Sequence, residues 1–184
     1  MAKKETQAGE DKVATSRTSS QCLGCSRGGV TTKIHLSAEG KARPLSLVLT
    51  EGQAADSPHL EAVLGAVLDG ICVRRVGRGR PRKRPGKVRL DRGYTGKPCR
   101  HLLCRRGIKH LIPERDDEKE ARKKRGQRGG RPVVFVKAEY AKRNVVERCI
   151  LRLKQFRRVA TRYEKLADCF LAIVTLASLI LWLR

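Results

Sequence analysis

The order of local patterns along this 184-residue chain predicts an α/β fold, with a mixed sheet flanked by helices. Two observations support that class. Short β-rich runs alternate with segments whose apolar residues recur at helical spacing, in the order strand, strand, helix, strand, helix, strand, helix. The chain is also long enough to bury a core within one domain.

The first two strands are expected at 31–37 and 44–50, where β-branched and aliphatic residues dominate. Glu39 and Gly40 lie between these runs and form a turn signal, so the two runs predict a β-hairpin. Residues 1–27 are polar throughout and predict a disordered N-terminal segment. The folded domain is therefore expected over 28–184.

A helix should follow the hairpin, with Asp56 as its N-cap and with Leu60 and Leu64 on its apolar face. A short strand that ends at Asp91 comes next. A helix that stops at Gly107 and a short strand over 108–113 follow it. The stretch 114–132 mixes charges of both signs and is expected to be a loop.

Two further helices should close the chain. The first is expected from about 137 to 159, and the second covers the apolar run from Cys169 to Leu183. A membrane span needs about twenty residues, and this run has fifteen. We therefore expect a buried core helix and no membrane contact. The alternative is a small membrane-associated protein held by this helix.

The charge of the chain predicts a polyanionic partner, most plausibly nucleic acid, with a membrane surface as the alternative. The formal net charge is +24, and only 4% of residues are aromatic, which favours contact with phosphates over stacking on bases. Ten basic residues and one acid lie between Arg74 and Arg92. This stretch is either a disordered basic arm or a loop that grips phosphates. Its candidate DNA-binding residues are Arg78, Arg80, Arg82, Lys83 and Arg84.

The seven cysteines are odd in number and scattered, and no secretion signal is evident at the start of the sequence. Free thiols in a reducing cytoplasm are the simplest interpretation. A zinc site is the alternative, since Cys22 and Cys25 form a CxxC pair. Its second half would have to come from the irregularly spaced Cys99, His101 and Cys104.

A polar stripe on the first of the two closing helices faces away from its apolar side. Tyr140, Arg143, Glu147 and Lys154 fall within roughly 60° of one another at helical spacing. Glu147 on this stripe and Asp91 at a strand end could together hold a divalent metal against phosphate. The alternative is an ordinary salt-bridged face, in which an i,i+4 pair contributes about 0.2–0.5 kcal/mol.

The spacing of these four residues resembles the Y-R-E-K signature of DDE-type transposases of bacterial insertion sequences. "SRGGVTTKIHL", "GQAADSPHLEAVL" and "KVRLDRGYTG" are also similar to segments of that family, in the same order. The resemblance covers Ser26 to the C-terminus. It implies a ribonuclease H-like fold in which acidic residues bind two Mg²⁺ (or Mn²⁺) ions for DNA nicking and strand transfer.

Carried over by position, the resemblance implies that Asp91 and Glu147 are catalytic and bind the metal. It implies that Arg143 and Lys154 contact DNA phosphates, with Tyr140 supporting that end of the stripe. The expected location is the bacterial nucleoid within the cytoplasm.

The sequence departs from the family at its first catalytic aspartate, which lies on a central first strand. Here Asp11 is the aspartate available before the hairpin, and ten polar residues precede it. We therefore expect 28–184 to be a partial DDE transposase catalytic domain that lacks the first central strand and is inactive alone. We expect such a chain to be a truncated transposase or the downstream product of a split reading frame, and in the second case a fused or partner transposase product would restore the missing acid. A homodimer is the other expected partner. The alternative is a non-catalytic basic DNA-binding protein that regulates or inhibits the full transposase.

Overall fold

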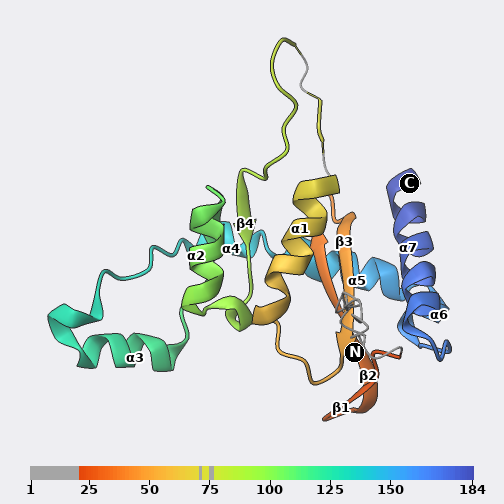
Figure 1. The fold of residues 1–184 in the computed structure, drawn as a ribbon, viewed down its shortest axis with the longest axis horizontal. Helices are drawn as coiled ribbons and strands as arrows, with labels where there is room; N and C mark the ends of the chain where they lie inside the picture. Colours follow the sequence, from red (N-terminus) through yellow and green to blue (C-terminus); the bar gives the residue numbers. More distant parts are fainter. Residues whose placement is uncertain (1–20, 71, 75–76) are drawn as a thin grey trace, which may run out of the picture.

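The computed structural model describes residues 21–70, 72–74 and 77–184, and within them it confirms an α/β chain (Figure 1). The predicted segment 1–27 falls mostly outside this part, as does Asp11. Its last residues contribute a strand, β1 (Gly24–Ser26). The strands form two separate sheets rather than the single mixed sheet that the sequence predicts.

The first sheet has the order β1-β2-β3 and is antiparallel, with β2 at Gly29–Ala38 and β3 at Pro44–Glu51. This confirms the predicted hairpin. The chain reverses where the Ala42 N–H donates to the Glu39 carbonyl at 2.9 Å, with Ala42 at φ 59°. The second sheet pairs β4 (Lys87–Arg89) with β5 (Lys109–Leu111) in parallel.

Helices pack on these sheets as two apolar clusters. The first core joins β2 and β3 to α5 (Asn144–Lys154), α6 (Arg157–Ala160) and α7 (Ala167–Leu183). The second core joins α1 (Leu60–Gly70) and α2 (Lys97–Arg105) to β4 and β5. α1 lies between the two cores, because it also packs on β3 and accepts a hydrogen bond from Ser46 Oγ at the Val63 carbonyl.

The end of α2 follows the prediction. Arg106 caps the helix, and Gly107 then takes a φ of 64°, in the left-handed region that favours glycine. The start of α1 differs from the prediction. Asp56 precedes a short 3₁₀ turn, Ser57–His59, but its side chain makes no capping hydrogen bond. Its carboxylate instead pairs with Lys33 Nζ at 2.9 Å, because β2 brings an ammonium group to that position.

The predicted loop over 114–132 is wrong, because it contains α3 (Asp116–Lys124) and a 3₁₀ turn, Gly126–Gly129. Three acids occupy the first turn of α3 and three bases its last turn, and these charges stabilise the helix because they have the opposite sign to the helix dipole at each end. Arg122 adds two hydrogen bonds to Glu114, at 3.0 and 3.1 Å. Charge order along the helix therefore outweighs the lack of an apolar face.

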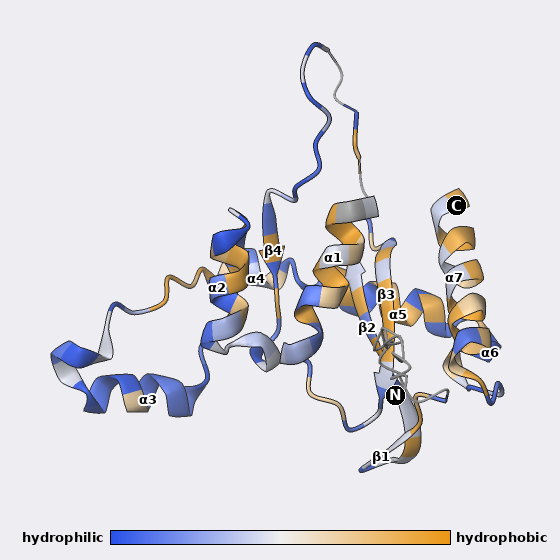
Figure 2. Cartoon of the chain, viewed as in Figure 1, coloured by the Kyte–Doolittle hydropathy of each residue, from blue (hydrophilic) through white to orange (hydrophobic). Residues whose placement is uncertain are grey.

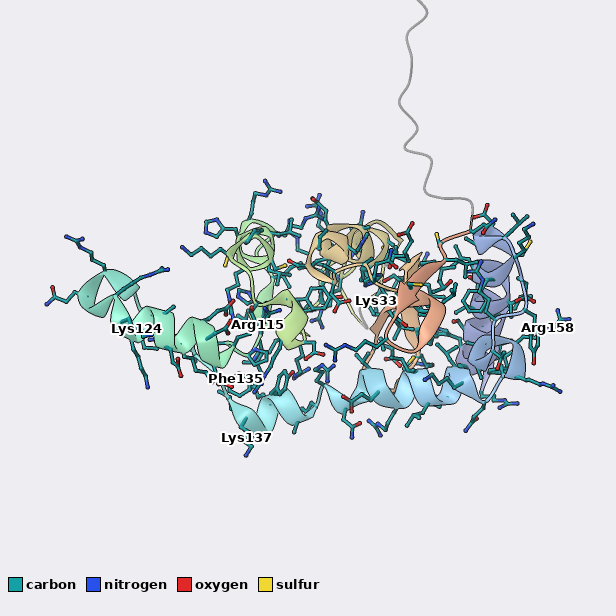
Figure 3. The ribbon with its side chains drawn as sticks, turned by 90° about the horizontal axis from the view of Figure 1, so that it is seen from below. Lys33, Arg115, Lys124, Phe135, Lys137 and Arg158 are labelled. Atoms are coloured by element: carbon teal, nitrogen blue, oxygen red, sulfur yellow. The ribbon has the colours of Figure 1, made fainter. Side chains whose placement is uncertain are left out.

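The prediction of one continuous helix over 137–159 is also wrong. The segment is divided into α4 (Lys137–Ala141), α5 and α6, with interruptions at Lys142 and Arg143 and at Gln155 and Phe156. Phe156 takes an extended conformation (φ −82°, ψ 113°) and packs against the first core. In Figure 3, α4 and α5 run along one side of the molecule, from near Lys137 toward Arg158.

α7 is a core helix along one face. Phe170, Val174 and Leu181 are buried against the first core, and Trp182 Nε1 donates to the Pro44 carbonyl at 2.6 Å. Leu176 and Leu179 lie on the other face and are exposed, so the expectation of a fully buried helix holds for half of α7. In the described part of the chain, no helix is long and apolar enough to cross a membrane.

Candidate active site at the end of β4

A cavity of about 320 Å³ lies between β2 and β4, where the two sheets face each other. In the described part of the chain, the edge of β2 that faces β4 is paired with β1 over 29–31 and has no strand partner over 32–38. The facing edge of β4 also has no strand partner among the described residues, because β4 pairs with β5 alone. Apolar side chains of α1 and α5 line the cavity, and Asp91 and Arg143 lie at its wall. A slot therefore separates the two sheets, and polar groups stand at one end of it.

Arg143 joins the two predicted catalytic carboxylates. Its Nη2 donates to Asp91 Oδ2 at 2.9 Å, and its Nη1 donates to Glu147 Oε1 at 2.7 Å. Side-chain exposure is 22% for Arg143, 52% for Asp91 and 56% for Glu147. The guanidinium is thus mostly covered, while both carboxylates keep oxygen surface open to solvent and to a ligand.

Two backbone features place Asp91 at this point. It follows β4 directly and caps the 3₁₀ turn Arg92–Tyr94, where its Oδ1 accepts from the Arg92 N–H at 2.7 Å. Tyr140 Oη donates to the same oxygen at 3.4 Å. Burial raises the pKa of Tyr140, so the phenol stays protonated and remains a donor.

α4 is fastened to β4 beside this site. Lys87 forms an ion pair with Glu139, and Arg89 Nε donates to the Glu139 carbonyl at 2.9 Å. The hydrogen bond from Lys87 lowers the pKa of Glu139. These contacts hold Tyr140, the next residue, over the end of the strand.

The remaining predicted DNA-binding residues lie apart from Asp91. Lys154, at the end of α5, lines a different groove of about 790 Å³ with Thr31 and Arg162. The basic loop 77–86 protrudes beyond α1 and β4 (Figure 1). All five of its candidate side chains are exposed, namely Arg78, Arg80, Arg82, Lys83 and Arg84.

The oxygen donors of Asp91 and Glu147 suit a hard divalent cation such as Mg²⁺, which takes one or two carboxylates and keeps water for its other positions. Arg143 competes for the same oxygens. Within the described residues, no group of three His, Cys, Asp or Glu side chains converges. The two carboxylates therefore fit part of a metal site and not all of it.

Sequence reasoning missed a polar network on the opposite wall of the cavity. His35 is buried, its Nε2 lies 2.8 Å from Thr50 Oγ1, and its Nδ1 lies 3.5 Å from Asp56 Oδ1. Burial, reinforced by the nearby His59, lowers the pKa of His35, so its imidazole is neutral. The signal was the alternation of Lys33, His35 and Ser37 with aliphatic residues, which places three polar side chains on one face of β2.

Tyr94 lines the same cavity as His35, Asp56 and Asp91. Burial, with Asp56 as the next cause, raises the pKa of Tyr94 to about 12. Asp56 and Asp91 both line the cavity, and each is paired with a cation, Asp56 with Lys33 and Asp91 with Arg143.

Comparison with known proteins relates the chain to one family. A family model described as "Transposase DDE domain" matches residues 8–182. The chain is also 31% identical, over 154 residues, to a Burkholderia cepacia protein whose name assigns it to transposition of insertion sequence element IS402. That alignment covers 82% of this chain and 63% of the relative, so the chain spans less than two thirds of the relative's length. No solved structure matches the chain.

Proposed function

The chain belongs to the family of transposase DDE domains, and on that premise we propose that it carries DNA-cutting and DNA-joining residues for transposition. The observation that carries the proposal is the convergence of Asp91 and Glu147 on Arg143. In this proposal both carboxylates are catalytic and hold a divalent metal, and the substrate is a DNA phosphodiester.

The metal would be Mg²⁺ or Mn²⁺, held by Asp91 and Glu147. When bound, such an ion polarises the scissile phosphate and lowers the pKa of the attacking water. Arg143 now neutralises both carboxylates, and metal binding would release its guanidinium toward a phosphate oxygen, which it can contact with two donors. Tyr140 keeps the Asp91 carboxylate oriented through its hydroxyl.

A ribonuclease H-like sheet is the proposed complete form. In the described part of the chain, the slot has an unpaired edge on each side, β2 over 32–38 and β4, and the apolar faces of α1 and α5 line it. This is the environment that an inserted strand requires. A strand from outside the described residues would join the two sheets into one. It would also carry the third carboxylate, so we propose that the described part turns over no DNA without it. A second transposase product is the proposed source of this strand, and a homodimer is a further proposed assembly.

DNA would be held by two further basic surfaces. Lys154 and Thr31 line the same groove. The ammonium of Lys154 and the hydroxyl of Thr31 would both contact a phosphate there. The basic loop 77–86 lies apart from the carboxylates, so we propose that it grips the backbone of flanking DNA and adds affinity without sequence preference.

The alternative is a DNA-binding regulator of the complete transposase. The observation that favours it is that Arg143 forms ion pairs with both Asp91 and Glu147, whereas the side chains of the basic loop are exposed and open to DNA. A chain of this kind would compete for DNA without cutting it.

Binding of Mn²⁺ to the full chain, followed by electron paramagnetic resonance, tests the catalytic proposal without requiring turnover. We expect saturable binding that Glu147→Gln and Asp91→Asn each weaken at least tenfold. Glu120→Gln, a change of an exposed glutamate on α3, is the matched control and should leave binding unchanged.

Equal Mn²⁺ binding in all four proteins would contradict the assignment of these carboxylates. The alternative, a DNA-binding regulator, would be favoured if the chain shows no specific Mn²⁺ binding and still binds DNA in the presence of EDTA. Its affinity for DNA should then fall steeply as the salt concentration rises.

A further inference from the structure

The outward face of α7 carries a regular apolar seam. Cys169, Ala172, Leu176, Leu179 and Leu183 are separated by three, four, three and four residues, which is the spacing of a two-helix contact. The buried face, centred on Val174 and Leu181, points the opposite way into the first core. Leu176 is 60% exposed, Leu179 53% and Leu183 79%. The seam is therefore an unpaired packing surface on a helix already fixed by its other side.

The seam lies where two copies of this cationic chain can approach. α7 stands at the edge of the molecule remote from α3 (Figure 1), and many of its residues are hydrophobic, whereas α3 and the basic loop are largely hydrophilic (Figure 2). No charged residue occurs between Asp168 and Arg184. Since each copy carries a net charge of +24, contact through most other surfaces would bring cations together.

The two halves of the seam complement each other in size and charge. Its first half has the small side chains of Cys169 and Ala172, and its second half has leucines. In an antiparallel pair centred on Leu176, Leu183 of one helix meets Cys169 of the other, and Leu179 meets Ala172. The Asp168 end of each helix then lies beside the Arg184 end of its partner, and the helix dipoles oppose.

We propose that α7 joins two copies of this chain in an antiparallel, two-fold pair through this seam. A parallel pair would place small side chains opposite each other and bring the two Asp168 residues together. A second copy fits best because a two-fold contact requires a surface complementary to itself, as this one is. The inference does not depend on the proposed catalytic residues.

The pair is expected to be weak and to respond to salt. A helix of 17 residues is about 25 Å long, and one face of it buries less than the roughly 800 Å² per partner of a standard stable interface. Screening of the charge on each copy should strengthen association as ionic strength rises, whereas DNA binding should weaken. The two processes can thus be separated by salt alone.

Sedimentation velocity of the full chain over a concentration series, at low and high salt, tests association. We expect a monomer–dimer equilibrium that tightens with salt. Leu176→Asp should weaken the dimer roughly a hundredfold, since two buried leucines are lost at the two-fold axis. Leu151→Asp is the matched control, because Leu151 on α5 is 64% exposed and lies outside the seam. A monomer at every concentration, or equal effects of the two variants, would overturn the proposal.

Disulfide cross-linking tests the antiparallel register independently. The starting protein has three exposed cysteines replaced by serine, namely Cys25, Cys72 and Cys104. Addition of Leu183→Cys and a mild oxidant should then give a dimer linked between positions 169 and 183. A link between two copies of Cys169 would indicate a parallel pair. Either that link or flotation of a monomeric chain with lipid vesicles would overturn the proposal.

Discussion

The two cores of this molecule differ in size and in what they carry. Among the described residues, the first core contains eleven buried residues, most of them on the β2–β3 hairpin and on three helices, and α5 of this core carries Glu147. The second contains six, on α1, on α2 and directly before and after β5, and Asp91 follows β4, whose Val88 packs against this core. The two carboxylates of the candidate site therefore belong to different cores. The site exists only while both cores keep their relative position.

Few polar contacts cross the boundary between the cores beside the site. Arg143 reaches Asp91 from the start of α5, and the Lys87–Glu139 pair ties β4 to α4. On the other side, Ser46 of β3 contacts α1. The smaller core therefore limits the stability of the site. Four substitutions test this conclusion, in order of decreasing effect on stability.

The largest effect is expected from Leu103→Ala in the second core. Leu103 is fully buried, so its truncation should cost about 3–5 kcal/mol of unfolding free energy. Urea denaturation followed by circular dichroism measures the loss. Leu151→Ala, at an exposed leucine near the first core, should change stability by less than about 0.5 kcal/mol. A loss below about 1 kcal/mol for Leu103→Ala would mean that the second core contributes little.

The next effect concerns His35, whose lowered pKa makes stability depend on pH. The folded protein binds fewer protons at this site than the unfolded chain, so His35 destabilises the fold as pH falls below the ordinary value of 6.5. Above that value its contribution is constant. Loss of its hydrogen bond to Thr50 in His35→Gln should cost about 1–3 kcal/mol at neutral pH.

Thermal melting from pH 7.5 downward measures this dependence. The fall in melting temperature below pH 6.5 should be smaller in His35→Gln than in the native chain. His101→Gln, at an exposed histidine of α2, should keep the native pH profile. Identical profiles in all three proteins would exclude His35 as the source.

A smaller effect on stability is expected from Arg143→Gln, which removes the link between the two carboxylates. Two partly exposed ion pairs are lost, at a cost of roughly 0.5–1.5 kcal/mol in total. Mn²⁺ affinity, measured by isothermal titration calorimetry, should rise several-fold because the competing cation is gone. Arg148→Gln removes an exposed charge from the same helix and should leave Mn²⁺ affinity within twofold of the native value. Equal affinity in both variants would show that Arg143 does not compete.

The smallest effect on stability is expected from the basic loop. Alanine at its five candidate positions should change the unfolding free energy by less than about 0.5 kcal/mol, because these side chains are exposed. The affinity for DNA should fall by the same factor for all sequences. The slope of the logarithm of the binding constant against the logarithm of the salt concentration should become shallower by roughly four if all five side chains contact phosphates. Fluorescence anisotropy on two unrelated duplexes measures both. An unchanged slope would mean that the loop grips no phosphate.

Sequence reasoning succeeded where a pattern is local. The hairpin, α1, α2 and β5 follow from alternation, helical spacing and the glycine at 107, which act within a few residues. It failed over 114–132 and 137–159. Mixed charges over 114–132 predict a loop, but their order along the chain, acids first and bases last, stabilises α3. Over 137–159, periodicity predicts one continuous helix, but the packing of Phe156 interrupts it.

The candidate site divides in the same way. The spacing of Tyr140, Arg143 and Glu147 is a property of the sequence, and so is the apolar seam of α7. Asp91 lies about fifty residues from this stripe, and its contact with Arg143 depends on how the second core is held beside the first. The same packing separates Lys154 into another groove and brings Asp56 and His35 to the cavity. Local patterns fix helices and strands because their hydrogen bonds span a few residues, whereas distant side chains meet only through tertiary packing.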